Sequence, residues 1–114
     1  MMSPQVYAPD RGDIIWINFN PQSGKEHKGR RPAFVVSPVE YNRKVGLAIV
    51  CPITSQIKGY PFEVLISEKQ STEGVIIADQ VKSLDWKVRK AEFIEKAKNE
   101  ITEEVIKKLL LLIF

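Results

Sequence analysis

Residues 14–19 read Ile-Ile-Trp-Ile-Asn-Phe, and residues 32–37 read Pro-Ala-Phe-Val-Val-Ser. Both runs are rich in β-branched and aromatic residues, which pack well on a pleated sheet. Pro21 and Pro38 stand just beyond their ends, where a strand is easily stopped. The runs therefore predict two strands. Because the first is apolar on both of its faces, we expect it to be covered on two sides or to meet a partner on one.

Shorter apolar runs follow, separated by glycine and proline. They predict strands over residues 47–53, 62–66, 75–78 and 80–84, with Glu63 facing water and one helical turn at 41–44. Residues 91–94 fit a last strand, although 89–98 also fits a helix. Many short strands with turn residues between them predict a mainly β fold, a small and strongly bent barrel.

The end of the chain predicts an α-helix. Thr102 is a candidate N-cap, and the two glutamates after it stand where acidic groups favour a helix start. Apolar residues then recur at helical spacing: Val105, Ile106, Leu109, Leu110 and Ile113. Because the last residues are apolar on nearly every side, we expect this helix to pack on the barrel and to lie near a homodimer contact.

The composition limits the class of protein. A chain of 114 residues is long enough for one domain, 1–114, but not for two. The formal net charge of +3 mildly favours an anionic partner. Cys51 is the only cysteine, no signal-type segment starts the chain, and the apolar end is far shorter than the ~20 residues of a membrane span. These features predict a cytoplasmic protein without a membrane anchor.

The loop between the first two strands carries a high density of functional groups. Within residues 24–32 these are Lys25, Glu26, His27, Lys28, Arg30 and Arg31, and His27 is the only histidine of the chain. Cationic and proton-transfer groups in a glycine-containing loop suit a bound phosphate. The same composition also fits a solvated hairpin tip. One histidine and one cysteine, without a tight carboxylate cluster, argue against a metal site.

Four strings at ordered spacing carry a family resemblance. They are Gly-Asp-Ile-Ile-Trp with Asn-Phe-Asn-Pro in residues 12–21, Glu-His-Lys-Gly-Arg-Arg-Pro-Ala-Phe-Val-Val-Ser-Pro in 26–38, Cys-Pro-Ile-Thr-Ser-Gln-Ile-Lys-Gly-Tyr-Pro-Phe-Glu-Val in 51–64, and Gly-Val-Ile-Ile-Ala-Asp-Gln-Val-Lys-Ser in 74–83. Together they resemble the MazF/PemK toxins of type II toxin–antitoxin modules. The resemblance implies an SH3-like β-barrel of the CcdB/PemK type and a homodimer. It also implies sequence-specific cleavage of single-stranded mRNA without a metal or other cofactor, and inhibition by a cognate antitoxin.

The resemblance also implies site residues. Arg31 matches the family's arginine before the second strand, Thr54 its threonine at the end of the third, and Glu26 its loop glutamate. His27 and Arg30 differ from the family pattern, so which group moves the protons stays open. An alternative function is a non-catalytic toxin of the same fold that binds a protein such as DNA gyrase, and another is an inactive SH3-like binding module. The combination of Arg31 with Thr54 favours the nuclease.

Metal-free RNA cleavage uses the 2′-OH as the nucleophile. It needs a base, a group that stabilises the phosphorane charge, and an acid for the 5′-oxygen. Arg31 can present a planar fork to the phosphate, Thr54 can donate a hydrogen bond to it, and Glu26 and His27 are the candidate proton carriers. Structural roles are the alternative: Arg31 could pair with Asp13 or Glu63, Thr54 could cap a turn, and His27 could be a bystander.

The loops are expected to bind the substrate and the antitoxin. The candidate RNA-binding residues are Lys25, Lys28, Arg30, Gln56, Lys58, Tyr60, Gln80 and Lys82. Of these, Tyr60 can stack on a base or can belong to the barrel rim. Trp16 and Trp86 are expected to stay partly exposed in so small a barrel, where an acidic and partly disordered antitoxin can cover them.

Overall fold

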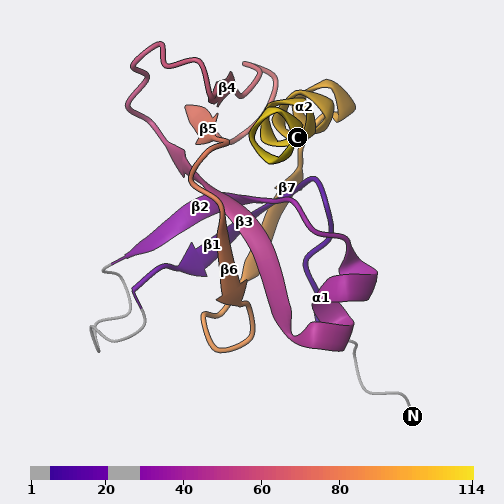
Figure 1. Ribbon diagram of the computed structural model, residues 1–114. Helices are drawn as coiled ribbons and strands as arrows, with labels where there is room; N and C mark the ends of the chain where they lie inside the picture. Colours follow the sequence, from indigo (N-terminus) through magenta and orange to yellow (C-terminus); the bar gives the residue numbers. More distant parts are fainter. Residues whose placement is uncertain (1–5, 21–28) are drawn as a thin grey trace.

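The computed structural model describes residues 6–20 and 29–114 of the chain (Figure 1). The elements in this part are β1 (Asp13–Asn18), β2 (Arg30–Val35), α1 (Val39–Val45), β3 (Leu47–Thr54), β4 (Glu63–Leu65), β5 (Val75–Ile77), β6 (Lys82–Asp85), β7 (Glu92–Lys96) and α2 (Asn99–Ile113). A mainly β fold with a C-terminal helix is therefore confirmed. The ambiguous segment near residue 92 is a strand, and the helical turn predicted at 41–44 lies within α1.

The strands form one antiparallel sheet in the order β4-β5-β3-β2-β1-β7, and β6 also pairs with β3. The long strand β3 joins the parts of this sheet. Its first half pairs with β6 and its last two residues pair with β5, while β2 lies along its other edge. In the described part of the chain no ladder joins β4 to β7, so the sheet is SH3-like in arrangement but does not close into a complete barrel.

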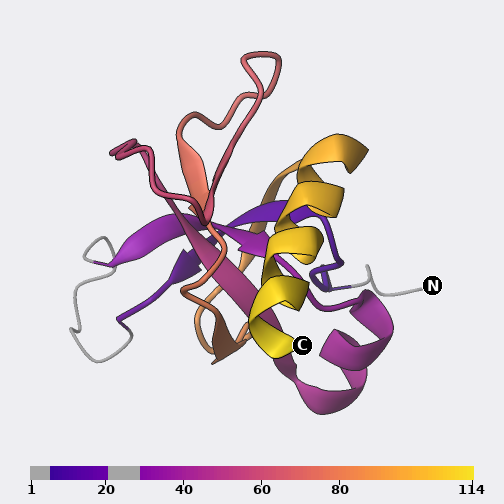
Figure 2. The same ribbon diagram turned by 45° about the horizontal axis from the view of Figure 1, so that its top comes forward.

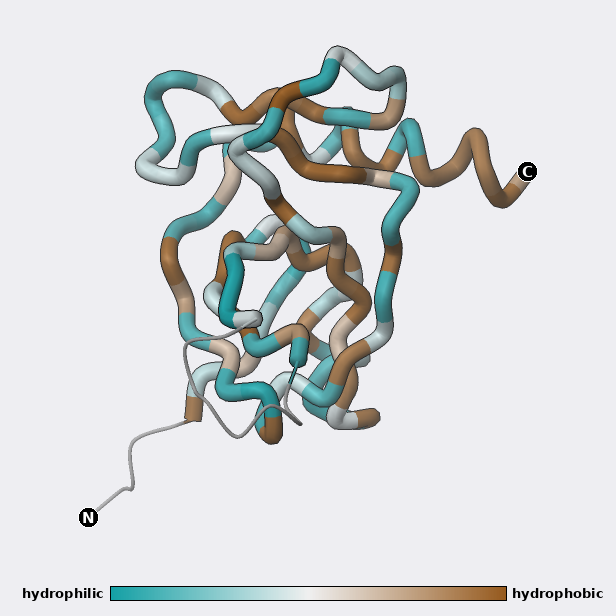
Figure 3. Tube along the Cα trace, turned by 90° about the vertical axis from the view of Figure 1, so that its left-hand side faces the viewer, coloured by the Kyte–Doolittle hydropathy of each residue, from teal (hydrophilic) through white to brown (hydrophobic). Residues whose placement is uncertain are grey.

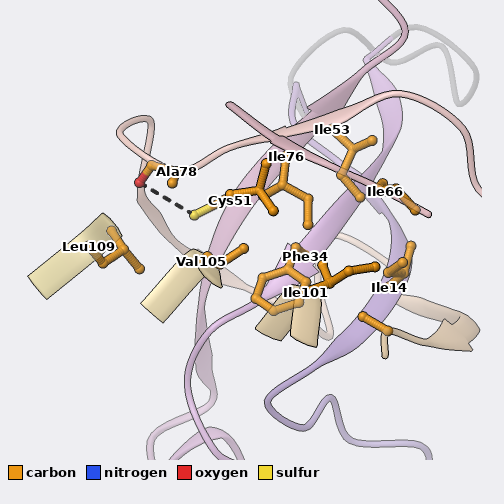
Figure 4. Packing of buried hydrophobic residues seen from close by; sticks show 12 residues of the cluster. Ile14, Phe34, Cys51, Ile53, Ile66, Ile76, Ala78, Ile101, Val105 and Leu109 are labelled. Carbon is orange, nitrogen blue, oxygen red and sulfur yellow. Dashed lines mark hydrogen bonds between the residues drawn. The ribbon is translucent and has the colours of Figure 1, made fainter. Parts of the chain in front are cut away.

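Two apolar cores cover the two faces of the sheet. Successive side chains of a strand point to opposite faces, so Ile14 and Ile15 belong to different cores. The core around Ile14 and Phe34 is covered by α2 through Ile101, Val105 and Leu109 (Figures 2 and 4). The other core includes Ile15, Ile17, Ala33, Val35, Ala48, Val50, Leu84 and Trp86. The expectation that the first strand is covered on both sides is confirmed.

The start of α2 differs from the prediction. The helix begins at Asn99 with Lys98 as its N-cap, and the backbone N–H of Thr102 donates to the carbonyl of Lys98 at 3.1 Å. Thr102 is therefore inside the helix, and its prediction as the N-cap is wrong. A contact from outside the helix supports this start: the backbone N–H of Lys98 donates to Oε1 of Gln70 at 2.8 Å.

The last turns of α2 pack less closely than predicted. Leu110, Leu111, Leu112 and Ile113 are all exposed, and Phe114 is 99% exposed. Figure 3 shows this apolar end of the helix extending away from the rest of the chain. The first part of α2 packs on the sheet as expected, whereas its end presents an uncovered apolar surface. None of the helices in the described ranges is long and apolar enough to cross a membrane.

Candidate active site

The ladder between β2 and β3 brings Arg31 and Thr54 together. Ala33 of β2 lies opposite Pro52 of β3. Two residues further along each strand, in opposite chain directions, are Arg31 and Thr54, and a step of two residues keeps a side chain on the same face. Both residues line one pocket of about 620 Å³. The two residues most strongly implied in the chemistry therefore face the same space.

The wall of this pocket comes mainly from β3 and from residues 55–61. The lining residues are Arg31, Pro52, Ile53, Thr54, Gln56, Lys58, Gly59, Tyr60, Pro61, Glu63, Ile77, Asp79 and Gln80. A neighbouring hollow of about 350 Å³ shares Arg31, Pro52 and Gln80 with it and adds Phe19, Asn20, Gly29 and Lys82. Arg31 thus stands between two adjoining hollows, a shape suited to a chain of linked nucleotides.

The hydroxyl of Thr54 is oriented by its own loop. Its Oγ1 accepts a hydrogen bond from the backbone N–H of Gln56 at 3.2 Å. Because a hydroxyl can both accept and donate, the hydroxyl proton is left to donate into the pocket. Gly74, which directly precedes β5, lies close to the backbone of Thr54 and has a φ of +111°. A Cβ at Gly74 would lie 2.2 Å from the carbonyl oxygen of Thr54, so glycine is required there.

Arg31 is exposed at the pocket, and the alternative pairings considered for it do not occur. Asp13 accepts instead from the hydroxyl of Tyr7 and pairs with Lys96, whose Nζ is 2.6 Å away. Glu63 accepts from the backbone N–H groups of the 55–61 loop. Within residues 6–20 and 29–114, therefore, neither of these carboxylates pairs with Arg31, and its guanidinium can face a phosphate.

Cys51 is poorly suited to act as a nucleophile. It is fully buried in the core beneath α2 (Figure 4), and burial raises the pKa of its thiol to about 12. The reactive form of a cysteine is the thiolate, which is scarce near neutral pH when the pKa is this high. The expectation that Cys51 acts as a small buried apolar residue is confirmed.

The protein-family model described as "PemK-like, MazF-like toxin of type II toxin-antitoxin system" matches residues 10–113 of the chain. The chain belongs to this family.

Individual relatives agree with the family assignment. The endoribonuclease toxin MazF of Escherichia coli strain K12 is 53% identical over 85 residues, which cover 75% of this chain and 76% of that protein. The endoribonuclease toxin ChpB of the same strain is 35% identical over 106 residues, with coverages of 88% and 90%. Both relatives are named as endoribonuclease toxins.

Solved structures support the fold. MazF of Deinococcus radiodurans matches with a TM-score of 0.86 at 47% identity, covering 95% of this chain and 98% of that one. A chain of the MazE-MazF complex from the same organism matches with a TM-score of 0.85 at 44% identity, with coverages of 95% and 97%. The sequence resemblance and the SH3-like fold that it implied are thus confirmed.

The two hollows beside Arg31 contain most of the RNA-binding candidates that lie in the described residues. Gln56, Lys58, Tyr60 and Gln80 line the larger pocket. Lys82 lines the adjoining hollow, with its Nζ 5.7 Å from the ring centroid of Phe19. Lys25, Glu26, His27 and Lys28 lie outside the described residues, so their expected roles remain predictions.

Arg30 is not brought to this site. Neighbouring residues of a strand point to opposite faces, and Arg30 therefore points away from Arg31. Its guanidinium donates to Asn18 at 3.1 Å and pairs with Glu92. The sequence alone could have indicated that Arg30 and Arg31 face different sides of β2, because only one of two consecutive residues in a strand can face the pocket. This pairing gives Arg30 a structural contact outside the two hollows, and its expected contact with RNA remains a prediction.

The two tryptophans have different environments. Trp16 is 43% exposed on β1, as expected for a residue that meets a partner. Trp86 is only 4% exposed, and its indole N–H donates to the backbone carbonyl of Asn42 at 2.9 Å. The expectation that Trp86 remains available to an antitoxin is wrong, because α1 covers it and its polar atom is already bonded inside the protein.

The sequence did not suggest a role at the site for Phe19, Glu63 or Asp79, all of which line the two hollows. Phe19 lines the smaller hollow, and Glu63 and Asp79 line the larger one. Glu63 was expected to face water, but its carboxylate is bonded to backbone N–H groups of the adjacent loop. Asp79 directly precedes Gln80 in the 74–83 string that resembles the family, and this place in the string could have suggested a role for Asp79 at the site.

Proposed function

We propose that this chain, an endoribonuclease toxin of a type II toxin–antitoxin system, cuts single-stranded mRNA at specific sequences without a metal. The observation that carries the proposal is the shared pocket of Arg31 and Thr54. The nucleophile is the 2′-OH next to the scissile phosphate. The 2′-OH gives its proton to a base as the 2′-oxygen bonds to phosphorus. The bond from phosphorus to the 5′-oxygen breaks, and that oxygen takes a proton from an acid, so the products are a 2′,3′-cyclic phosphate and a 5′-OH.

Arg31 and Thr54 stabilise the charge that develops on the phosphate. A guanidinium can donate two parallel hydrogen bonds to phosphate oxygens, and Arg31 reaches both adjoining hollows. Thr54 adds a hydroxyl donor whose oxygen is already oriented by the N–H of Gln56. Donors that are fixed in place before the reaction need no reorganisation in the transition state.

The proton carriers are assigned from the sequence. Glu26 is the proposed base for the 2′-OH, and His27 is the alternative acid or base. Both stand a few residues before Arg31 in the chain. Gln56, Lys58, Tyr60, Gln80 and Lys82 are proposed to hold the phosphates and bases on either side of the cut, which would give the cleavage its sequence preference.

The proposed inhibitor is an acidic cognate antitoxin. The MazF of Deinococcus radiodurans occurs in complexes with MazE. In this chain Trp16 is exposed, and the lysines around the pocket provide charge complementarity for a flexible acidic segment. An mRNA substrate places the protein in the cytoplasm.

A test in EDTA separates the proposed function from its alternatives. We expect the pure protein to cut a long single-stranded RNA equally well with and without EDTA, because no step uses a metal. End analysis should find a 2′,3′-cyclic phosphate and a 5′-OH. A 5′-phosphate product would contradict attack by the 2′-OH. An intact RNA, together with binding to a protein target such as gyrase, would favour the non-catalytic toxin.

We also propose that the exposed end of α2 mediates a homodimer. An apolar groove there is lined by Arg11, Thr102, Glu103, Ile106, Lys107, Leu110, Leu111 and Phe114. Light scattering at micromolar concentration should give about twice the chain mass of 13.0 kDa, because association removes this apolar surface from water. Leu111→Glu should shift the mass toward the monomer, and the exposed control Glu68→Gln should not. A wild-type monomer would contradict the proposal.

A further inference from the structure

The wall of the larger pocket formed by residues 55–61 has little apolar support. Every one of these residues is exposed, including Ile57 and Tyr60. A segment without buried side chains gains little from the hydrophobic effect, and its conformation must therefore be fixed by polar contacts. The segment nevertheless supplies the candidate RNA contacts Gln56, Lys58 and Tyr60, and Gly59 between them also lines the pocket.

Glu63 provides the first polar contact. Its carboxylate accepts from the backbone N–H of Lys58 at 3.2 Å and from that of Gly59 at 3.0 Å. Gly59 has a φ of +74°, a left-handed conformation that glycine adopts readily. The carboxylate thus holds the tip of the segment in a turn and directs the backbone of Lys58.

Asp79 provides the second contact, from the turn after β5. Its Oδ2 accepts the hydroxyl of Tyr60 at 2.8 Å. Its Oδ1 is buried and has no hydrogen-bond partner among the described residues. A buried polar atom without a partner is costly. Asp79 thus keeps its hydrogen bond to Tyr60 in a position where its other carboxylate oxygen has no partner among the described residues.

Both carboxylates line a pocket that is proposed to bind a polyanion. Negative charges near a phosphate repel it, so Glu63 and Asp79 should weaken RNA binding if charge were their whole effect. Their hydrogen bonds offer a compensating role, because a bond to a charged acceptor is stronger than a neutral one. Lys108 of α2 adds a third contact, with its Nζ 2.6 Å from the carbonyl of Pro61.

We propose that Glu63 and Asp79 are positioning residues for the RNA pocket, which act by holding the 55–61 segment in its binding conformation. The proposal rests on the proposed ribonuclease function. Glu63 acts through the backbone of Lys58 and Gly59, and Asp79 acts through the ring of Tyr60. Neither residue is required to touch the reacting phosphate, which is bound by Arg31 and Thr54.

Substitutions at Glu63 separate positioning from charge. Glu63→Ala and Glu63→Gln both remove one negative charge, but Gln keeps a carbonyl oxygen that can accept from the loop. Positioning predicts that Ala raises KM about 5–10-fold while kcat changes less than about twofold, and that Gln restores most of the loss. Charge alone predicts that both variants lower KM. Glu68→Ala, an exposed acid that does not line the pocket, is the matched control.

Tyr60→Phe and Asp79→Ala test the second contact. Tyr60→Phe keeps the ring but removes the hydroxyl, and it should raise KM in the same way. Adding Asp79→Ala, which removes the acceptor, to Tyr60→Phe, which removes the donor, should then have little further effect, because both changes remove the same bond. The bond raises the pKa of Tyr60, so an ultraviolet titration of Asp79→Ala should show this phenol ionising at lower pH than in the wild type. Additive losses of the two substitutions would contradict the proposal.

Amide hydrogen exchange without RNA tests the loop directly. Lys58 and Gly59 should exchange faster in Glu63→Ala than in the wild type or Glu68→Ala, while the amides of β3 remain protected. Unchanged exchange together with a lowered KM would overturn the positioning role. A wild-type protein that cuts no RNA would instead contradict the proposed function, and the exchange comparison would still decide whether Glu63 holds the segment.

Discussion

Replacing Arg31 with alanine should lower kcat for RNA cleavage by about 10²–10³-fold, the usual cost of losing one charge-stabilising donor. The side chain is exposed at the junction of the two hollows. It pairs with neither Asp13 nor Glu63 within the described residues. Its substitution therefore removes the proposed phosphate contact without leaving either of these carboxylates unpaired. The measurement is single-turnover cleavage of a defined RNA in EDTA.

Two further variants make the Arg31 result specific. Arg31→Lys keeps the charge but loses the planar fork, so it should recover little of the rate. Arg43→Ala removes an exposed arginine of α1 that does not line either hollow, and it should cleave like the wild type. A lysine variant with nearly native kcat would show that a simple positive charge is enough, and it would refute the two-pronged contact.

The fold was predictable wherever the deciding pattern is local. The alternation in residues 14–19 indicated a strand covered on both faces, and Ile14 and Ile15 do lie in opposite cores. The start of α2 was not predictable in this way. Thr102 has the residue type of an N-cap, but Gln70, a residue distant in the sequence, bonds the N–H of Lys98 and helps to begin the helix earlier.

The site shows the same contrast between features that a local sequence pattern reveals and features that depend on contacts between distant residues. Arg31 and Thr54 were found through the family resemblance, and only the pairing of β2 with β3 placed them in one pocket. Trp86 was misjudged because its burial depends on α1, whose carbonyl at Asn42 accepts the indole N–H. A single sequence shows that a tryptophan is large and apolar, but it does not show which element covers it.

Thr54→Ala should lower kcat by about 10²-fold, and Thr54→Ser should stay within about tenfold of the wild type. The physical reason is the orientation of the hydroxyl. Its oxygen accepts from the N–H of Gln56 at 3.2 Å, and its proton is therefore available to a phosphate oxygen in the pocket. Serine retains both the acceptor and the donor, whereas alanine retains neither. Rapid-mixing cleavage in EDTA, with kcat and KM determined separately, is the measurement.

Thr54→Val is the matched control for shape, because valine keeps the branched side chain but lacks the hydroxyl. If the hydroxyl stabilises the transition state, valine should be as slow as alanine, and the loss should appear in kcat more than in KM. If Thr54 serves mainly to pack beside Gly74 and β5, valine should instead cleave nearly as fast as the wild type. Loss of the Gln56 contact alone would loosen the 55–61 segment and raise KM. A large fall in kcat for valine, with KM little changed, therefore identifies a donor to the phosphate and not merely a support for the loop.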